Sequence, residues 1–218
     1  MNIPPPAGHQ TPDQAAAPAQ PVIEEALHSF WEKNRRLILI ACAAALLVVL
    51  GREGWHYIQA EREQSVQAEF ARAGDKPEQL SAFAKANEGH GLAAIALLRI
   101  ADQRYAAGDY RQALENYNKA VSGLTNAAVL GRARIGAAMS QLNAGEKTSA
   151  EIAFKAISVE AALPKGIRAE ATYHLASLAL EAGNATEVSR LVAEIGKIDP
   201  TGIWAQRSTT LLVGKPAL

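Results

Sequence analysis

The sequence predicts an all-α protein in which a single apolar transmembrane helix precedes a solenoid of helix-turn-helix units. Residues 37–51 form an uninterrupted apolar run, and glycine-centred turns recur further along the chain at intervals of 34, 37 and 38 residues. Strand signals are weak, because no sustained alternation of Val, Ile and Thr surrounds an Asn-Gly or Asp-Gly pair. The chain has 22 basic and 22 acidic side chains. This balance disfavours nucleic acid as a partner, since no global field attracts it.

The N-terminal residues 1–22 are expected to form a disordered tail. Six prolines lie here among Ala, Gln and Gly. Such a composition cannot bury enough apolar area to offset the entropy lost on ordering. A short amphipathic stretch follows, and we assign residues 23–36 to a juxtamembrane segment.

Residues 37–54 are predicted to cross a membrane. Fifteen apolar residues rise about 22 Å as a helix, less than the roughly 30 Å of a bilayer core. The flanks nevertheless favour a span, because aromatic rings settle at membrane interfaces and arginines extend outward from a short helix. Bilayers also thin locally around short helices. The flanking residues are Trp31, Arg35, Arg36, Arg52 and Trp55.

Three alternatives to an uncleaved anchor remain open. A cleaved signal peptide has an apolar core of this length, but 36 residues would precede it and its cleavage site would need Val49 and Gly51. Residues 39–42 match the short pattern at lipoprotein cleavage sites, although the apolar run continues beyond Cys42. A buried core helix would not need the basic and aromatic flanks.

The charges around the apolar run predict its orientation. Lys33, Arg35 and Arg36 precede the run, whereas Arg52 and Arg62 follow within twenty residues. Basic residues concentrate on the cytoplasmic side of a span. The count therefore favours a cytoplasmic N-terminus and repeats on the opposite side of the membrane.

Four turn glycines define the repeats, namely Gly74, Gly108, Gly145 and Gly183. Positions seven before and five after each of the last three carry Ala or Val, which lets paired helices approach closely. The spacing, and the Asp199-Pro200 pair that ends the last unit, are typical of the tetratricopeptide repeat, whose unit has 34 residues. A generic alanine-rich bundle with glycine C-caps is the alternative.

This register divides the helical domain, residues 55–213, into four units and a cap. The units are expected at about 57–90, 94–125, 131–164 and 168–201, and the cap at 201–213. Ile203, Trp204, Leu211 and Leu212 are available to cover the last unit, since a terminal repeat needs a lid for solubility.

In repeats of this type the first helix of each unit lines the concave surface, chiefly three, six, ten and thirteen positions before the glycine. The predicted groove is apolar and aromatic, with Asp102, Arg132 and Glu170 interspersed. Leu98 and Asp102 stand where a carboxylate-binding groove needs a cation and Asn, so we expect an apolar peptide, a partner helix or an unfolded segment as ligand. The candidate groove residues are Ile95, Leu98, Tyr105, Ile135, Met139, Leu142, Tyr173 and Leu180. Alternatively, Tyr105, Met139 and Tyr173 pack against a neighbouring helix or the cap.

Catalytic and cofactor patterns are absent from the sequence. None of the five histidines lies four residues from another histidine or from the single cysteine, Cys42, so we expect no metal site. Nucleophile-elbow and phosphate-binding glycine motifs are also missing. His174, on a helix, is more typical of a packed residue than of a general base. We therefore expect a protein that is not an enzyme and binds no cofactor.

The order of the parts resembles one bacterial family. A short cytosolic segment, a span after Phe30-Trp31 and a basic flank, a helical stalk, and then residues 83–87 and 91–94 resemble the membrane-anchored ancillary subunit of the SecYEG translocon. The resemblance covers residues 24–215. It implies a single-pass inner-membrane protein whose repeats face the periplasm and assist emerging proteins beside the translocon and its chaperones. An oligomeric envelope scaffold, in cell division or polymer export, is the alternative.

Overall fold

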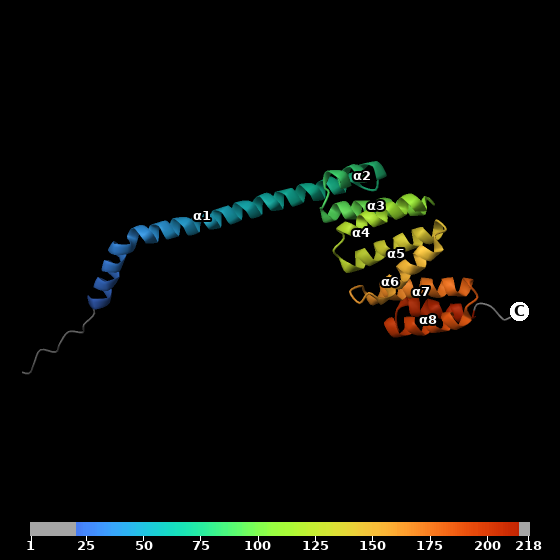
Figure 1. Ribbon diagram of the computed structural model, residues 1–218. Helices are drawn as coiled ribbons and strands as arrows, with labels where there is room; N and C mark the ends of the chain where they lie inside the picture. Colours follow the sequence, from blue (N-terminus) through green and yellow to red (C-terminus); the bar gives the residue numbers. More distant parts are fainter. Residues whose placement is uncertain (1–20, 214–218) are drawn as a thin grey trace, which may run out of the picture. The chain divides into compact units, whose positions relative to one another are not determined.

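The computed structural model describes residues 21–213, which form nine helices and no strand (Figure 1). The prediction of an all-α fold is therefore confirmed. The predicted tail lies almost wholly outside the described residues, but Pro21 and Val22 already belong to the first helix, where proline is tolerated. The helices are α1 (Pro21–Ala73), α2 (Pro77–Ala86), α3 (Gly91–Ala106), α4 (Tyr110–Gly123), α5 (Ala127–Asn143), α6 (Lys147–Val159), α7 (Lys165–Glu181), α8 (Ala185–Ile198) and α9 (Ile203–Val213).

Helix α1 runs without interruption through the ranges predicted as juxtamembrane segment, span and stalk. Contacts within the chain divide it into two compact units, and the boundary falls after Ala60. In the first unit Leu37, Leu47 and Val48 are 68–70% exposed, and the most apolar stretch of α1 has a mean hydropathy of 2.1 with none of it buried. By length and composition α1 can cross a membrane, and the alternative of a buried core helix is wrong.

The second unit is a stack of helix pairs. Each helix from α2 to α8 packs against the next, and α9 packs on both α7 and α8. The first helices of successive pairs also touch, because α3 contacts α5 and α5 contacts α7. Contacts confined to neighbouring pairs are the mark of a solenoid.

The turns inside three of the pairs have the same local structure. Gly108, Gly145 and Gly183 have φ of +80°, +87° and +71°, and the residue after each donates its N–H to a carbonyl five positions back at 2.9 Å. This is a helix C-cap that needs the left-handed conformation, which glycine adopts without strain. Gly74, after α1, has φ of +54°.

Small residues form the contacts between paired helices. The positions seven before and five after the turn glycines hold Ala101 and Ala113, Ala138 and Ala150, and Ala176 and Val188, all at most 2% exposed. Larger side chains such as Tyr117 and Phe154, 4% and 0% exposed, fill the space beside them. The core is thus a series of three clusters along the stack rather than one centre.

Candidate functional site

The structure separates the predicted groove residues into buried and partly exposed sets. Leu98 and Ile135, ten positions before their turn glycines, are 5% and 6% exposed and belong to two of the core clusters. Their assignment to a groove surface is therefore wrong, because this position points between the stacked helices. Ile95, Tyr105, Met139, Leu142, Tyr173 and Leu180 are each partly exposed.

Tyr105 joins three helices. Its hydroxyl accepts a hydrogen bond from Nδ2 of Asn143 on α5 at 2.8 Å, and its ring meets Tyr110 of α4 edge-on with centroids 5.4 Å apart. Burial raises the pKa of Tyr105, against the effect of the Asn143 bond. Met139 and Leu142 pack against the cluster around Phe154. These side chains hold the stack together and still present part of their surface to solvent.

Charged side chains on successive first helices alternate in sign, from Asp102 on α3 to Arg132 on α5 and Glu170 on α7. Asp102 of α3 accepts bonds from the Tyr117 hydroxyl at 2.7 Å and from Nη2 of Arg132 on α5 at 2.6 Å. Burial, with a smaller contribution from Asp102, raises the pKa of Tyr117. On α7 the pKa of Glu170 is raised by burial, while Arg207 of α9 and Arg132 oppose this rise. Among the described residues of this surface, Arg132 is paired with Asp102 and is not free to bind a carboxylate.

Helix α9 covers part of the last pair. The Trp204 ring lies 5.0 Å from that of Tyr173 and 5.9 Å from that of His174, and Leu211 packs against the adjacent core. Tyr173 is therefore a packing residue, although it was predicted to line the groove. Ile203 and Leu212, expected to help cover the last unit, are instead 54% and 53% exposed.

His174 is unsuited to general base chemistry near neutral pH. It stacks on Phe154 with centroids 5.0 Å apart, and burial lowers the pKa of His174 to about 4. The imidazole is therefore neutral at pH 7, and among the described residues no acidic group is bonded to it to orient a proton transfer. In the part of the chain that the structure describes, no three His, Cys, Asp or Glu side chains gather closely enough to hold a metal.

Two hollows lie between the second helices of successive pairs. One, of about 550 Å³, is lined by residues of α2, α3 and α4 and includes Lys85 and Lys119. The other, of about 440 Å³, is lined by α6, α7 and α8. Neither is lined by any of the eight predicted groove residues. Neither hollow was predicted from the sequence. For the second hollow, the charges on the outer faces of α6 and α8 were the available signal.

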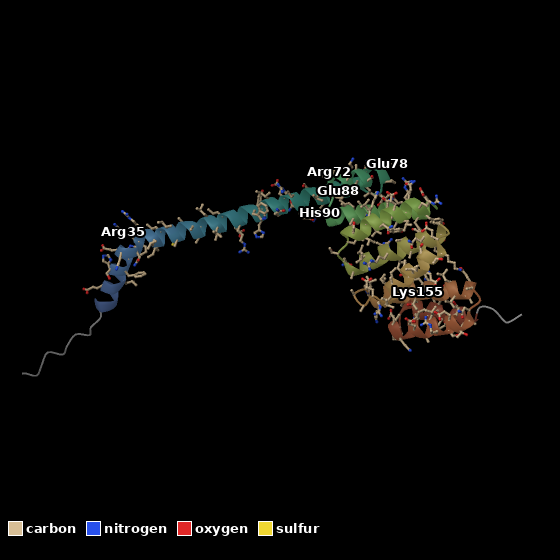
Figure 2. The ribbon with its side chains drawn as sticks, in the orientation of Figure 1. Arg35, Arg72, Glu78, Glu88, His90 and Lys155 are labelled. Carbon is tan, nitrogen blue, oxygen red and sulfur yellow. The ribbon has the colours of Figure 1, made fainter. Side chains whose placement is uncertain are left out.

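The membrane flanks lie on one helix. Trp31, Arg35, Arg36, Arg52 and Trp55 all belong to α1, and the Trp31 and Trp55 side chains are 49% and 63% exposed. Figure 2 marks Arg35 near a bend in this helix. Close to the bend, Asn34 donates from Nδ2 to the carbonyl of Phe30 at 2.9 Å.

Comparison with known families agrees with this architecture. A family model described as "Tetratricopeptide repeat-like domain" matches residues 28–135. The helical repeat is tetratricopeptide-like. The match includes the apolar part of α1 and continues to the middle of α5. The family model therefore includes both the long helix and the first helix pairs. No curated protein and no solved structure matches the chain. Tetratricopeptide-like repeats are typically non-catalytic modules for protein–protein interaction.

Proposed function

We propose that the chain is a membrane-anchored interaction protein, with α1 in a bilayer and the tetratricopeptide-like repeats binding other polypeptides. The apolar stretch of α1 is the observation that carries this proposal. Its apolar side chains are exposed on all sides of the helix, whereas most of the large apolar side chains of the repeats are buried or partly buried. An apolar surface of this length is stable in hydrocarbon and aggregates in water.

The anchor makes weak contacts effective. A repeat domain held at a membrane complex experiences a high effective concentration of the proteins that pass there, so each contact needs little affinity. Tyr105, Met139, Leu142 and Leu180 supply a partly exposed apolar surface on the first helices. Asp102, Arg132 and Glu170 add polar selectivity around it.

The membrane complex we propose is the bacterial translocon. The repeats would lie on the periplasmic side of the inner membrane and assist proteins that emerge from SecYEG. The order of tail, span, stalk and repeats supports this assignment, as does the excess of basic residues before the apolar run. No catalytic step is involved.

A second function is an envelope scaffold that oligomerises. The observation in its favour is the exposure of Ile152 and Val159 on α6, at 64% and 71%. Large apolar side chains exposed together on one helix of a folded domain commonly mark an interface.

Site-specific photo-crosslinking in cells separates these functions. Probes replace Tyr105 and Leu180 on the first helices, and Lys119 on α4 is the control. Capture of translocon subunits or nascent exported chains from the first two positions alone is the expected result. Capture of copies of the chain itself would favour the scaffold. If deletion of residues 4–22 abolished function while changes at Tyr105 and Leu180 did not, the tail would be the working part and the proposal would fail.

A further inference from the structure

The outer face of α6 carries an apolar stripe. Ile152, Ala156 and Val159 are exposed and stand at i, i+4 and i+7, which places them on one side of the helix. Within residues 61–212, Ile203 and Leu212 are the other large apolar side chains of comparable exposure. Those two lie nine positions apart, on opposite sides of α9. The large apolar side chains of α6 therefore form a continuous strip, whereas those of α9 do not.

A groove runs beside this stripe. It is the hollow of about 440 Å³ between α6 and α8, and Leu175, Leu178 and Leu191 contribute its apolar floor. Val159 belongs to both the stripe and the groove. We call the stripe and the groove together the α6–α8 face. Figure 2 labels Lys155, which stands on the α6 wall of the groove.

The two walls of the groove have opposite charge patterns. Along α6 the order is Lys147, Glu151, Lys155, and along α8 it is Glu187, Arg190, Glu194. Each wall is therefore the charge complement of the other at nearly the same helical spacing. A molecule that presents the α6 pattern would match the α8 wall.

Most of these charges are paired within their own helices, so they can exchange partners, whereas Lys147 pairs with Glu181 of α7 at 3.4 Å. Lys155 bonds Glu151 at 2.8 Å, and Arg190 bonds Glu187 and Glu194 at 2.7 and 2.9 Å. Among the described residues no ion pair joins α6 to α8. The pKa of Glu187 is lowered by its bond to Arg190 and more weakly by the charge of Lys155 across the groove. Exposed ion pairs contribute little to stability, so their exchange costs little.

We propose that a second copy of this chain docks on the α6–α8 face through a two-fold contact. The α6 stripe of each copy lies over the groove of the other, and Lys155 of one copy meets Glu187 of the second. The second copy fits because its own α6 supplies both the apolar stripe and the charge pattern that the α8 wall complements. A two-fold contact of this kind is self-complementary and closes as a dimer. Anchoring both copies in one membrane lets a small face suffice. This inference goes beyond the proposed function and does not depend on the translocon.

Cysteine crosslinking in native membranes tests the contact with the full-length chain. Cys42 is replaced by Ser, and Ala156, in the middle of the stripe, is replaced by Cys. The control is Ala82→Cys on the exposed side of α2. Mild oxidation is expected to give a disulfide-linked dimer from the Ala156→Cys chain at least tenfold faster than from the Ala82→Cys chain. Equal rates would overturn the proposal, and so would a photo-probe at position 156 that captures another membrane protein in place of a second copy.

Charge exchange tests the proposed pairing independently. Two differently tagged full-length chains are prepared, each with Cys42→Ser and Ala156→Cys. One chain also carries Lys155→Glu, and the other carries Glu187→Lys. Circular dichroism verifies that both chains retain the helical fold. Each variant alone is expected to lose at least half of the disulfide-linked dimer. Together they should form mixed dimers at close to the level of the parent chain, because one contact is restored and the other is unchanged. Mixed dimers no more frequent than either homodimer would contradict the contact. A failure here leaves the capture of other polypeptides at Tyr105 unaffected, so the two proposals fail separately.

Discussion

Helix α1 and the helices of the repeats use similar residues in opposite ways. In the first unit Leu46, Leu47 and Leu50 are 61–70% exposed, whereas Leu80, Phe154 and Ile195 in the second are fully buried. The apolar residues of α1 surround the helix on all sides. Those of α8, such as Val188, Leu191 and Ile195, recur at i, i+3 and i+7 on one side.

This difference shows what each part needs around it. A helix with an apolar side buries that side against another helix and leaves the remaining surface to water. A helix that is apolar all round requires an apolar environment, which the chain itself does not provide for α1. The comparison therefore predicts that changes in the two regions affect different properties, membrane retention in one and unfolding in the other.

The largest expected effect is the loss of Phe154. Phe154→Ala should lower the free energy of unfolding of the repeats by about 3–5 kcal/mol, because it leaves a cavity in a close-packed core and removes the ring on which His174 stacks. The measurement is urea denaturation in detergent, followed by circular dichroism. The control Leu47→Ala in α1 should leave the unfolding midpoint unchanged, and an equal shift in both variants would show that the two regions do not differ as described.

A charge in the apolar run should act on the membrane alone. Leu46→Arg places a guanidinium in the middle of the run at a cost of about 2.5–3.5 kcal/mol for insertion. The fraction of the protein that remains in membranes after alkaline extraction should fall sharply, while the melting temperature of the repeats stays constant. The matched control is Ala82→Arg on the exposed side of α2, which should remain in the membrane fraction. Full retention of the Leu46→Arg chain would refute the anchor.

The buried histidine should make the repeats less stable in acid. Burial lowers the pKa of His174 to about 4, below its ordinary value near 6.5, so the unfolded state binds more protons between these values. Stability is then complete above pH 6.5 and falls as the pH is lowered, by up to about 3 kcal/mol at pH 4. His174→Gln should flatten this dependence between pH 6.5 and 5. If the free energy of unfolding falls with pH at the same slope in the wild-type and His174→Gln chains, other titratable groups cause the dependence.

The smallest of these effects is expected at Gly136. A Cβ there would lie 2.6 Å from Cε1 of Tyr117, whose ring is held by the bond to Asp102. Overpacking of this kind costs about 1–3 kcal/mol, more than the helix propensity that alanine gains over glycine. Gly166→Ala on α7, where a new Cβ meets nothing within 4 Å, is the control and should not be destabilising. Thermal melts of the two variants give the comparison, and equal melting temperatures would place the Tyr117 ring elsewhere.

Features encoded locally were predictable from the sequence. Each turn glycine adopts positive φ because the helix C-cap requires it. The apolar run can be identified from its own composition, without knowledge of what packs against it. The helical class and the close contacts between small residues follow from the same local patterns.

Features that depend on how successive pairs rotate against each other were not predictable. The prediction of groove residues was wrong at Leu98 and Ile135, because the stacking of successive pairs turns these two side chains into the core. The two hollows between second helices likewise depend on the spacing of the stack.

The most direct test of the central claim uses the native Cys42. It lies in the apolar run and is exposed within the isolated chain, as is Ile152 in the repeats. A water-soluble maleimide is added to intact membranes that contain either the wild-type chain or Cys42→Ser with Ile152→Cys. If α1 lies in a bilayer, Cys42 should resist the reagent until the membrane is dissolved in denaturing detergent. The thiol introduced by Ile152→Cys should react in open membrane vesicles at the rate of a free thiol, or somewhat more slowly where copies pair. Rapid labelling of Cys42 in intact membranes would contradict the account.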